Sequence, residues 1–257
     1  MEPVRSSRNP RVAEAIRLQR ARRRAETGRT LLEGPHLVEE AVRAGALLET
    51  VFLCVGDETT TNLLTGLGVD TVLVTHTVMA KVAGTQHPRG PLAVMTIPPD
   101  QPVVAGSLLV SWGVGDPGNV GTLIRSAAAF GLGFLSGPGT ADPWSPKVLR
   151  AAAGTHFRTA IERPQVVSVD MLRGRGFTVV ASVVAGGASA EQLAGMDHCA
   201  LLVGDEGAGL PADVVRAADL RITIRMPGNT ESLNAGVAGS LLAYELAKTT
   251  KDLPHPD

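Results

Sequence analysis

Cys199-Ala-Leu-Leu-Val203 runs directly into Gly204-Asp-Glu-Gly-Ala-Gly-Leu-Pro211, and this junction decides the predicted fold. An uninterrupted apolar run that ends in a glycine-rich turn is typical of a strand buried on both faces. Similar apolar runs alternate with helical stretches along the rest of the chain. We therefore expect an α/β fold with buried strands.

Pro98-Pro-Asp-Gln-Pro102 breaks this alternation. Three prolines in five residues cannot continue a helix or a central strand, so we expect a domain boundary there. The boundary predicts one domain over 1–98 and a second over 104–250. The length of 257 residues, at roughly 150 residues per domain, also favours two.

Apolar periodicity and turn residues predict the individual elements. In the first half they are, in chain order, a helix at Arg11–Arg24, a strand at Thr30–Glu33, a helix at Pro35–Ala44, a strand at Thr50–Val55, a helix at Thr60–Leu67, a strand at Thr71–Val74, a helix at His76–Ala83 and a strand at Leu92–Ile97. In the second half the strands are Leu108–Trp112, Gly133–Ser136, Phe177–Ser182, Ala200–Val203 and Leu220–Ile224. The helices there are Val120–Phe130, Ser145–Ala152, Val166–Arg173, Pro211–Ala217 and Ser232–Lys248.

The last predicted helix is apolar on nearly all sides. Its small residues recur at four-residue spacing, at Ala235, Gly239, Ala243 and Ala247. A helix of this kind is buried in a core or an interface, and the small residues allow another backbone to approach closely.

Composition excludes several classes of protein. With 44% hydrophobic residues and a net charge of −1, disorder is not expected. The longest uncharged stretch, Ser126–Ala141, has 16 residues, fewer than the roughly 18 apolar residues of a membrane span. There is no apolar segment typical of a secretory signal, and neither Cys54 with Cys199 nor the six histidines show the spacing of a metal site. We expect a cytoplasmic protein that uses no metal and no membrane.

Residues 1–29 hold nine arginines against three glutamates, a local net charge of +6. One interpretation is a contact with a polyanion, since the guanidinium matches phosphate geometry. The other is a solvated helix face with charge pairs four residues apart. Aromatic residues make up only 3% of the chain, so a nucleic acid would be bound through its backbone and shape rather than by stacking.

Gly113-Val-Gly-Asp-Pro-Gly118 has the glycine spacing of a dinucleotide-binding turn. Two features disfavour that interpretation. The acidic residue that should end the following strand is missing there, because the nearest acid, Asp142, lies in a loop beyond it. Asp116 would also place a carboxylate where a phosphate needs donors. A dinucleotide-dependent oxidoreductase is therefore the least favoured hypothesis.

Two later segments bear polar groups at the expected carboxyl ends of strands. The loop Gly204–Pro211 carries Asp205 and Glu206 among its glycines, which suits a nucleoside with a positively charged tail better than a phosphate. It could also be a plain strand-to-helix turn. In the second segment, Ile224–Asn234, we expect Ser232 or Thr230 to cap the last helix and Asn234 to lie in its first turn.

Together these segments resemble the signature blocks of the SpoU/TrmH branch of the SPOUT RNA methyltransferases. The blocks are Asp116–Gly131, Leu202–Leu210 and Ile224–Glu245. Gly28–Glu40 and His87-Pro-Arg-Gly90 are similar to the ribosomal-protein-like α/β substrate-binding domain that this family often carries. The resemblance implies a C-terminal α/β domain with a trefoil knot, a rare exception among folds. It also implies a homodimer formed through that domain.

The activity implied by the resemblance is transfer of a methyl group from S-adenosyl-L-methionine to a ribose 2′-hydroxyl. The implied catalytic residues are Asn119, Arg125, Glu206, Ser232 and Asn234. The implied cofactor-binding residues are Val203, Gly204, Glu206, Gly207, Gly209, Ile224, Met226, Leu233 and Asn234. For RNA contacts we expect Arg5, Arg8, Arg22, Arg23, Arg29 and Arg89.

Arg125 is the residue at the position that the family credits with activating the hydroxyl. A guanidinium is not deprotonated in proteins, so we assign it to positioning the hydroxyl and stabilising developing alkoxide charge. Asn119 and Arg125 are six residues apart, and a bend in the loop before the helix is needed to direct both to one place. The favoured substrate is rRNA of the 23S type. A tRNA substrate, or a catalytically silent RNA-binding assembly factor, is the alternative.

Three positions depart from the family pattern. Asp205 stands where Asn is usual, and Arg225 stands where Pro is common. Ala-Gly-Val-Ala follows Asn234 where Val-Ser-Val-Ala is commoner. We expect activity to survive all three.

Overall fold

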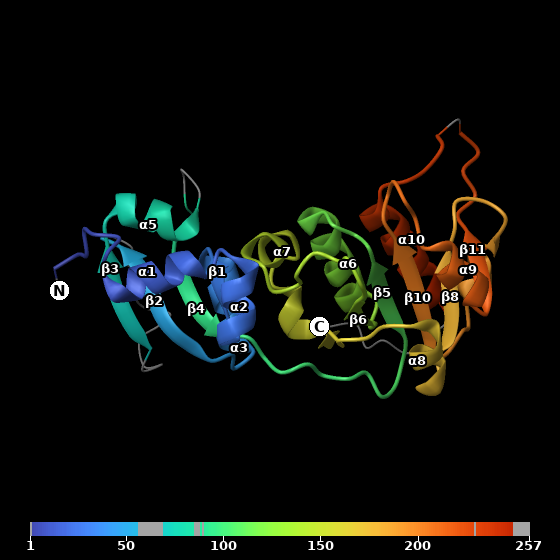
Figure 1. Ribbon diagram of the computed structural model, residues 1–257, viewed down its shortest axis with the longest axis horizontal. Coiled ribbons are helices and arrows are strands. Elements are labelled where there is room, and N and C mark those ends of the chain that lie inside the picture. Colours follow the sequence, from blue (N-terminus) through green and yellow to red (C-terminus); the bar gives the residue numbers. More distant parts are fainter. Residues whose placement is uncertain (1, 56–68, 85–87, 89, 229, 249–257) are drawn as a thin grey trace. The chain divides into compact units, whose positions relative to one another are not determined.

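The computed structural model describes residues 2–55, 69–84, 88, 90–228 and 230–248 (Figure 1). Two compact units are formed. Unit 1 comprises the chain up to Pro99 together with Trp144–Phe157, and unit 2 comprises Asp100–Pro143 and the chain from Arg158 onward. None of the helices in the described part is long and apolar enough to cross a membrane. The predicted helix Thr60–Leu67 lies outside the described residues.

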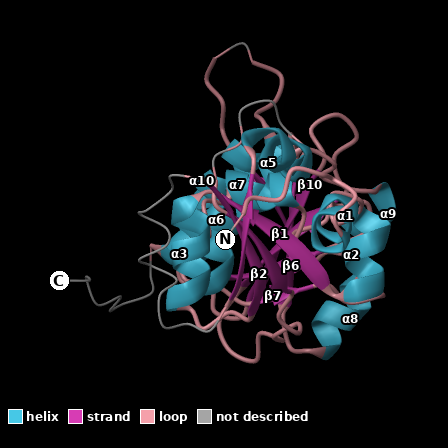
Figure 2. Cartoon of the chain, turned by 90° about the vertical axis from the view of Figure 1, so that its left-hand side faces the viewer, coloured by secondary structure: helices cyan, strands magenta, loops and turns pink. Residues whose placement is uncertain are grey.

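Unit 1 contains a four-stranded sheet in the order β1-β4-β2-β3. β4 pairs antiparallel with β1 and β2, while β2 and β3 are parallel. In Figure 2, α3 lies on one side of these strands and α1 and α2 lie on the other. The elements are α1 (Pro10–Arg17), α2 (Ala21–Thr27), β1 (Arg29–Glu33), α3 (Pro35–Arg43), β2 (Leu48–Cys54), β3 (Asp70–Val74), α5 (His76–Ala83), β4 (Leu92–Thr96) and, from the later segment, α7 (Pro146–Ala151).

The prediction of one helix over Arg11–Arg24 is wrong, because the chain breaks between α1 and α2. The guanidinium of Arg24 is buried, and it donates to the carbonyl oxygens of Leu18 at 2.9 Å and Gln19 at 3.1 Å. These carbonyls follow the end of α1, where no further turn of helix satisfies them. Arg24 therefore stabilises the turn between two helices and is not available to a phosphate.

Trp144–Phe157 packs with unit 1 although it interrupts the sequence of unit 2. The hydroxyl of Thr30 donates to the carbonyl oxygen of Trp144 at 2.5 Å. Arg150 on α7 forms an ion pair with Glu33 at the end of β1, with 2.6 Å between the charged atoms. The predicted domains, 1–98 and 104–250, assign Trp144–Phe157 to the second domain, whereas the structure groups this segment with the first.

Unit 2 is built on a seven-stranded parallel sheet in the order β7-β6-β5-β10-β8-β11-β9. The central strand β10 pairs with β5 on one side and β8 on the other. The elements of unit 2 are β5 (Leu108–Trp112), α6 (Pro117–Ala129), β6 (Gly133–Ser136), β7 (Ile161–Glu162), α8 (Val169–Gly174), β8 (Thr178–Ser182), β9 (Ala188–Ser189), η2 (Ala190–Leu193), β10 (Cys199–Gly204), α9 (Ala212–Ala217), β11 (Leu220–Thr223) and α10 (Ala235–Ala247). The short helix η1 (Thr155–Arg158) belongs to unit 1 except for its last residue.

The five predicted strands of this unit are confirmed to within one or two residues at each end. The two that sequence analysis missed, β7 and β9, are edge strands of two residues each and carry no apolar run. Such short strands are defined by their neighbours rather than by their own residues.

Helices α6 and α10 pack side by side and run parallel. Their contacts keep one register: Thr122 meets Gly236, Ser126 hydrogen-bonds Ser240 at 2.6 Å, and Phe130 meets Tyr244. A Cβ atom on Gly239 would overlap the side chain of Leu123 and touch Val203. Gly239, one of the predicted row of small residues, is thus closely approached, but by the side chains of Leu123 and Val203 rather than by another backbone.

Gly239→Ala is therefore expected to lower the free energy of unfolding by about 1–3 kcal/mol, because the added methyl overfills a closed contact. The loss should appear although alanine favours a helix over glycine. Urea denaturation followed by circular dichroism measures it. Gly174→Ala is the matched control, since a Cβ atom at Gly174 would have no neighbour within 4 Å and no destabilisation is expected there. Equal stabilities of the two variants would contradict the packing argument.

Candidate active site

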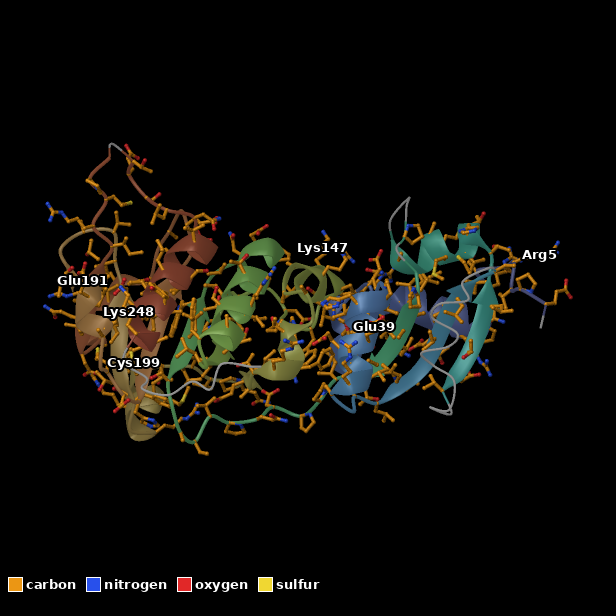
Figure 3. All side chains as sticks on the ribbon, turned by 180° about the vertical axis from the view of Figure 1, so that it is seen from behind. Arg5, Glu39, Lys147, Glu191, Cys199 and Lys248 are labelled. Carbon is orange, nitrogen blue, oxygen red and sulfur yellow. The ribbon has the colours of Figure 1, made fainter. Side chains whose placement is uncertain are left out.

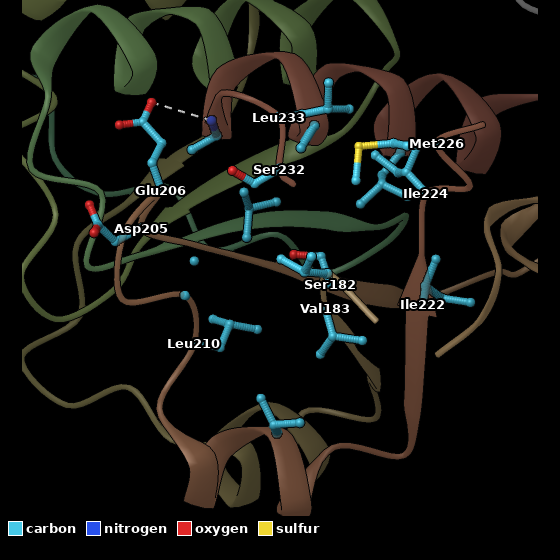
Figure 4. A pocket seen from close by; sticks show the side chains of 18 residues that line it. Ser182, Val183, Asp205, Glu206, Leu210, Ile222, Ile224, Met226, Ser232 and Leu233 are labelled. Atoms are coloured by element: carbon cyan, nitrogen blue, oxygen red, sulfur yellow. Dashed lines mark hydrogen bonds between the residues drawn. The ribbon is translucent and has the colours of Figure 1, made fainter. Parts of the chain in front are cut away.

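A pocket of about 260 Å³ opens at the carboxyl ends of β8, β10 and β11. The carboxyl edge of a parallel sheet is where ligands bind in open α/β folds. Figure 4 shows Ile222, Ile224 and Met226 on one side of the pocket and Asp205 and Glu206 on the other. The remaining lining is largely apolar and comes from the end of β8, the loop after β10, α9 and the start of α10.

Most of the predicted cofactor residues line this pocket. Those that do are Val203, Gly204, Glu206, Gly209, Ile224, Met226 and Leu233, and Ser232 joins them from the predicted catalytic set. Gly207 and Asn234 lie beside the lining but are not part of it. The lining residues that sequence analysis missed include Ser182, Val183 and Val184, at the end of β8. No motif marks them, and only the pairing of β8 with β10 brings them to the site.

The loop after β10 folds back on its own strand. A Cβ atom on Gly204 would overlap the backbone of Gly209 and Leu210, so a larger residue cannot stand there. One carboxylate oxygen of Asp205 accepts hydrogen bonds from the N–H groups of Gly207 at 3.0 Å and Ala208 at 3.1 Å. The bonds from Ala208 and Gly207 hold the pKa of the Asp205 carboxyl below its ordinary value. The aspartate thus fixes the shape of this loop.

Glu206 joins three separate segments. One oxygen of its carboxylate accepts from the side-chain amides of Asn119 and Asn234, the latter at 2.5 Å, and from the N–H of Ala235 at 3.4 Å. The amide of Asn234 also donates to the side-chain oxygen of Asn119 at 2.8 Å. The carboxylate lies beside the first turns of α6 and α10, where helix dipoles favour negative charge.

The expected cap of the last helix is wrong. Asn234, not Ser232 or Thr230, precedes α10, and its side-chain oxygen accepts from the N–H of Val237 at 3.1 Å. Ser232 lies two residues upstream, on the pocket wall. Asn234 therefore serves the helix through its oxygen and Glu206 through its amide nitrogen.

The expected bend between Asn119 and Arg125 is also absent. α6 begins at Pro117, capped by Asp116, so both residues belong to one regular helix. At 3.6 residues per turn, six positions separate the two side chains by about 120° around the axis. Arg125 is exposed, and no ion pair or hydrogen bond joins it to the described residues. The structure brings together Asn119, Glu206 and Asn234 but not Arg125.

The predicted RNA-binding arginines of unit 1 divide into two groups. Arg5 and Arg8 are exposed, and Figure 3 shows Arg5 projecting from the N-terminal segment. The others are paired, Arg22 with Glu26, Arg23 with Glu14 and Glu26, and Arg29 with Glu49. Both interpretations of the basic segment thus find support in different residues. Arg89 and His87 lie outside the described residues.

The described part of the chain offers little support for a metal site or for a cysteine nucleophile. No group of three or more His, Cys, Asp or Glu side chains there is arranged to hold a metal ion. Burial raises the pKa of the Cys199 thiol to about 12, so it is not a thiolate nucleophile at neutral pH.

The pocket combines an apolar wall with two carboxylates, and no lysine or arginine is among its lining residues. This suits a ligand that carries both an apolar ring system and positive charge. S-adenosylmethionine has an adenine ring, a sulfonium and an ammonium group, and it fits that description. The fold and the pocket together are those of an α/β protein that binds a nucleoside-containing cofactor at the carboxyl edge of its sheet.

Comparisons with known proteins place this enzyme in a family. Residues 106–244 match the SpoU rRNA methylase family, and residues 9–93 match the MRM3-like substrate-binding domain. A 23S rRNA (guanosine(2553)-2′-O)-methyltransferase of Bacillus subtilis is 34% identical over 96% of this chain and 99% of its own. The crystal structure of an AdoMet-bound rRNA methyltransferase from Sinorhizobium meliloti has a TM-score of 0.84 and 25% identity, covering 98% of this chain and 99% of its own. That of an RNA 2′-O ribose methyltransferase has a TM-score of 0.79 and 29% identity, covering 95% and 98%.

The chain belongs to the SpoU rRNA methylase family. It is an S-adenosylmethionine-dependent RNA methyltransferase that acts on a ribose 2′-hydroxyl. The α/β fold with an N-terminal substrate-binding domain, expected from the resemblance, is confirmed.

A substitution at Asp205 tests whether the loop after β10, residues 204–211 (the cofactor loop), holds the cofactor. Asp205→Ala removes the acceptor for two backbone N–H groups, and we expect the dissociation constant for S-adenosylmethionine to rise about tenfold. Asp205→Asn keeps a side-chain oxygen that can accept the same bonds, so it should stay within about threefold of the wild type. Titration calorimetry measures both. Equal losses of affinity in the two variants would show that the charge of Asp205 contributes more to cofactor binding than its hydrogen bonds to the loop.

Proposed function

We propose that the substrate is 23S-type rRNA of the large ribosomal subunit. The observation that carries the proposal is the hydrogen bonding of Asn119 and Asn234 to each other and to Glu206 on the pocket wall, because it assembles all three signature segments of the family at one place. The full-length similarity to a 23S rRNA methyltransferase supports the choice of RNA. Exposed Arg5 and Arg8 on unit 1 supply positive charge for phosphate contacts.

The residues of the pocket would hold the cofactor by complementary chemistry. Ile222, Ile224 and Met226 offer an apolar surface to its adenine, and the carboxylates of Asp205 and Glu206 attract its cationic part. When bound, S-adenosylmethionine supplies an electrophilic methyl group. The closed loop after β10 keeps these contacts in place.

The chain's own part in the transfer is to align the hydroxyl and to stabilise the charge that develops on its oxygen as its proton passes to solvent. Glu206 already accepts three hydrogen bonds on one oxygen, so its role is to hold Asn119 and Asn234 rather than to take a proton. A fixed pair of amides beside the pocket could orient a ribose. Arg125, with its charge unpaired within the described part, would stabilise the alkoxide that develops on the 2′-oxygen.

We also propose that the enzyme works as a homodimer through unit 2. Val237, Leu241 and Tyr244 form one stripe on α10 and are each between 44% and 49% exposed. An apolar stripe of this kind on a helix is typical of a covered surface. Arg125 is exposed on the neighbouring helix α6, so a second copy seated on the stripe would lie near it. The trefoil knot and a cytoplasmic location, both expected from the sequence, complete the proposal.

Arg125→Ala is expected to reduce methyl transfer by about 10²-fold or more, since it removes the charge that opposes the alkoxide. Methyl-labelled S-adenosylmethionine would be incubated with the enzyme and unmodified rRNA or tRNA, and label followed into alkali-resistant dinucleotides. These survive alkali only where the 2′-hydroxyl is methylated. Cofactor affinity should remain within a few-fold, because Arg125 does not line the pocket.

The same assay distinguishes the candidate functions. Alkali-resistant label in rRNA alone supports the proposal. Alkali-resistant label in tRNA alone would show that the substrate is tRNA and not rRNA. Cofactor binding without label in rRNA, tRNA or intact ribosomal particles would favour a silent assembly factor. Full transfer by Arg125→Ala would refute its role.

Leu241→Glu is expected to convert the dimer to a monomer, because it places a charge in the centre of the apolar stripe. Light scattering coupled to size-exclusion chromatography gives the mass. Val166→Glu is the control, since Val166 is 72% exposed on unit 2 and lies outside α10. A wild-type mass equal to that of one chain would contradict the dimer.

A further inference from the structure

The chain leaves β11 along the rim of the cofactor pocket. Ile224 and Met226 both line the pocket, whereas Arg225 between them is exposed. Successive side chains of an extended segment point to opposite sides, so this alternation directs the guanidinium out of the pocket and into solvent at its edge.

Arg225 has no carboxylate partner among the described residues. Three other arginines of unit 2 are engaged in ion pairs at 2.7–2.8 Å, Arg163 with Asp100, Arg173 with Asp219 and Arg175 with Glu162. Arg225 shares its lack of a carboxylate partner in the described part with Arg125, Arg216 and Arg221. The charge of Arg225 is therefore not used by the fold.

The pocket beside Arg225 and the loop that follows it carry negative charge, and the nearest cation along the chain is Arg221, which is exposed on β11. Asp205 and Glu206 line the pocket, and Glu231 is exposed on the same loop as Arg225. Lysine and arginine are missing from the lining itself. This distribution attracts a cationic cofactor, but it repels the phosphates of an RNA that must bring a ribose to the pocket mouth. A cation on the rim is needed to offset the repulsion.

We propose that Arg225 binds a phosphate of the substrate RNA beside the methylated nucleotide. The guanidinium can donate two parallel hydrogen bonds to phosphate oxygens. The residue takes no part in the transfer itself and does not touch the cofactor. This inference rests on the proposed RNA substrate, and it assigns a function to a position where the family pattern commonly has proline.

The test measures binding of in vitro transcribed, unmodified 23S rRNA in the presence of S-adenosylhomocysteine, which prevents transfer. Arg225→Ala should weaken binding about 5- to 20-fold at low salt, through loss of one charge-assisted contact. The slope of log K against log salt should become shallower by about 0.7–0.9, the value of one phosphate contact. Affinity for S-adenosylmethionine should stay within about twofold, since the side chain lies outside the pocket.

Two further variants sharpen the result. Arg225→Lys keeps the charge, so the salt slope should match the wild type while the affinity falls slightly. Arg216→Ala removes an exposed arginine that also has no carboxylate partner in the described part, from the last turn of α9. It should change neither the affinity nor the slope.

Wild-type affinity and slope in Arg225→Ala would overturn the inference. An equal loss in Arg216→Ala would do the same, because it would indicate a diffuse charge effect. Weakened cofactor binding in Arg225→Ala would show that the residue supports the loop, which also overturns the proposed contact. If the wild-type enzyme binds no RNA at all, the proposed function fails and this inference fails with it.

Discussion

The active site depends on one carboxylate oxygen. Glu206 accepts hydrogen bonds from Asn119 on α6, from Asn234 before α10 and from the backbone of Ala235. A carboxylate oxygen can accept several donors at once, and here the positive ends of two helix dipoles also favour its charge. Removing it would leave two amides and a backbone N–H without their acceptor. The cofactor loop, the first helix and the last helix would then lose their common contact.

That convergence requires α6 and α10 to run parallel, with Asn119 in the first turn of α6 beside Asn234 at the start of α10. The requirement is met by small residues: Gly236 lies against Thr122, and Gly239 lies against Leu123. Ser126 and Ser240 add a hydrogen bond in the same register. Close packing of this kind leaves no room for larger side chains at these two positions, so the glycines of α10 help to place Asn119 and Asn234 beside each other. The other side of α10 exposes Val237, Leu241 and Tyr244, the stripe on which the proposed dimer rests.

Much of unit 2 could be predicted because its strands are apolar runs bounded by glycine and proline. Such runs report burial directly, and the loop after β10 was placed correctly for the same reason. The weaker predictions concern the ends of helices and the breaks between them. Ser232 and Asn234 are both good caps, and nothing in the local sequence shows that Glu206 engages the amide of Asn234. The break between α1 and α2 depends on the buried guanidinium of Arg24. From the sequence alone an arginine in a basic helix is expected on the surface, so this break could not be predicted.

The resemblance of its motifs to a known family supplied eight of the 18 residues that line the pocket. The sequence by itself determined the order of the main helices and strands, the glycine-rich turns and the division near Pro98. These follow from local periodicity and from steric preferences, which neighbouring residues express. Only the tertiary structure decided that Glu206 binds Asn119, that Ser182 to Val184 complete the pocket, that Trp144–Phe157 joins unit 1, and that Arg125 stands apart. Asn119 and Glu206 are 87 residues apart in the chain. Contacts at that separation are set by strand order and helix packing, which no local pattern encodes.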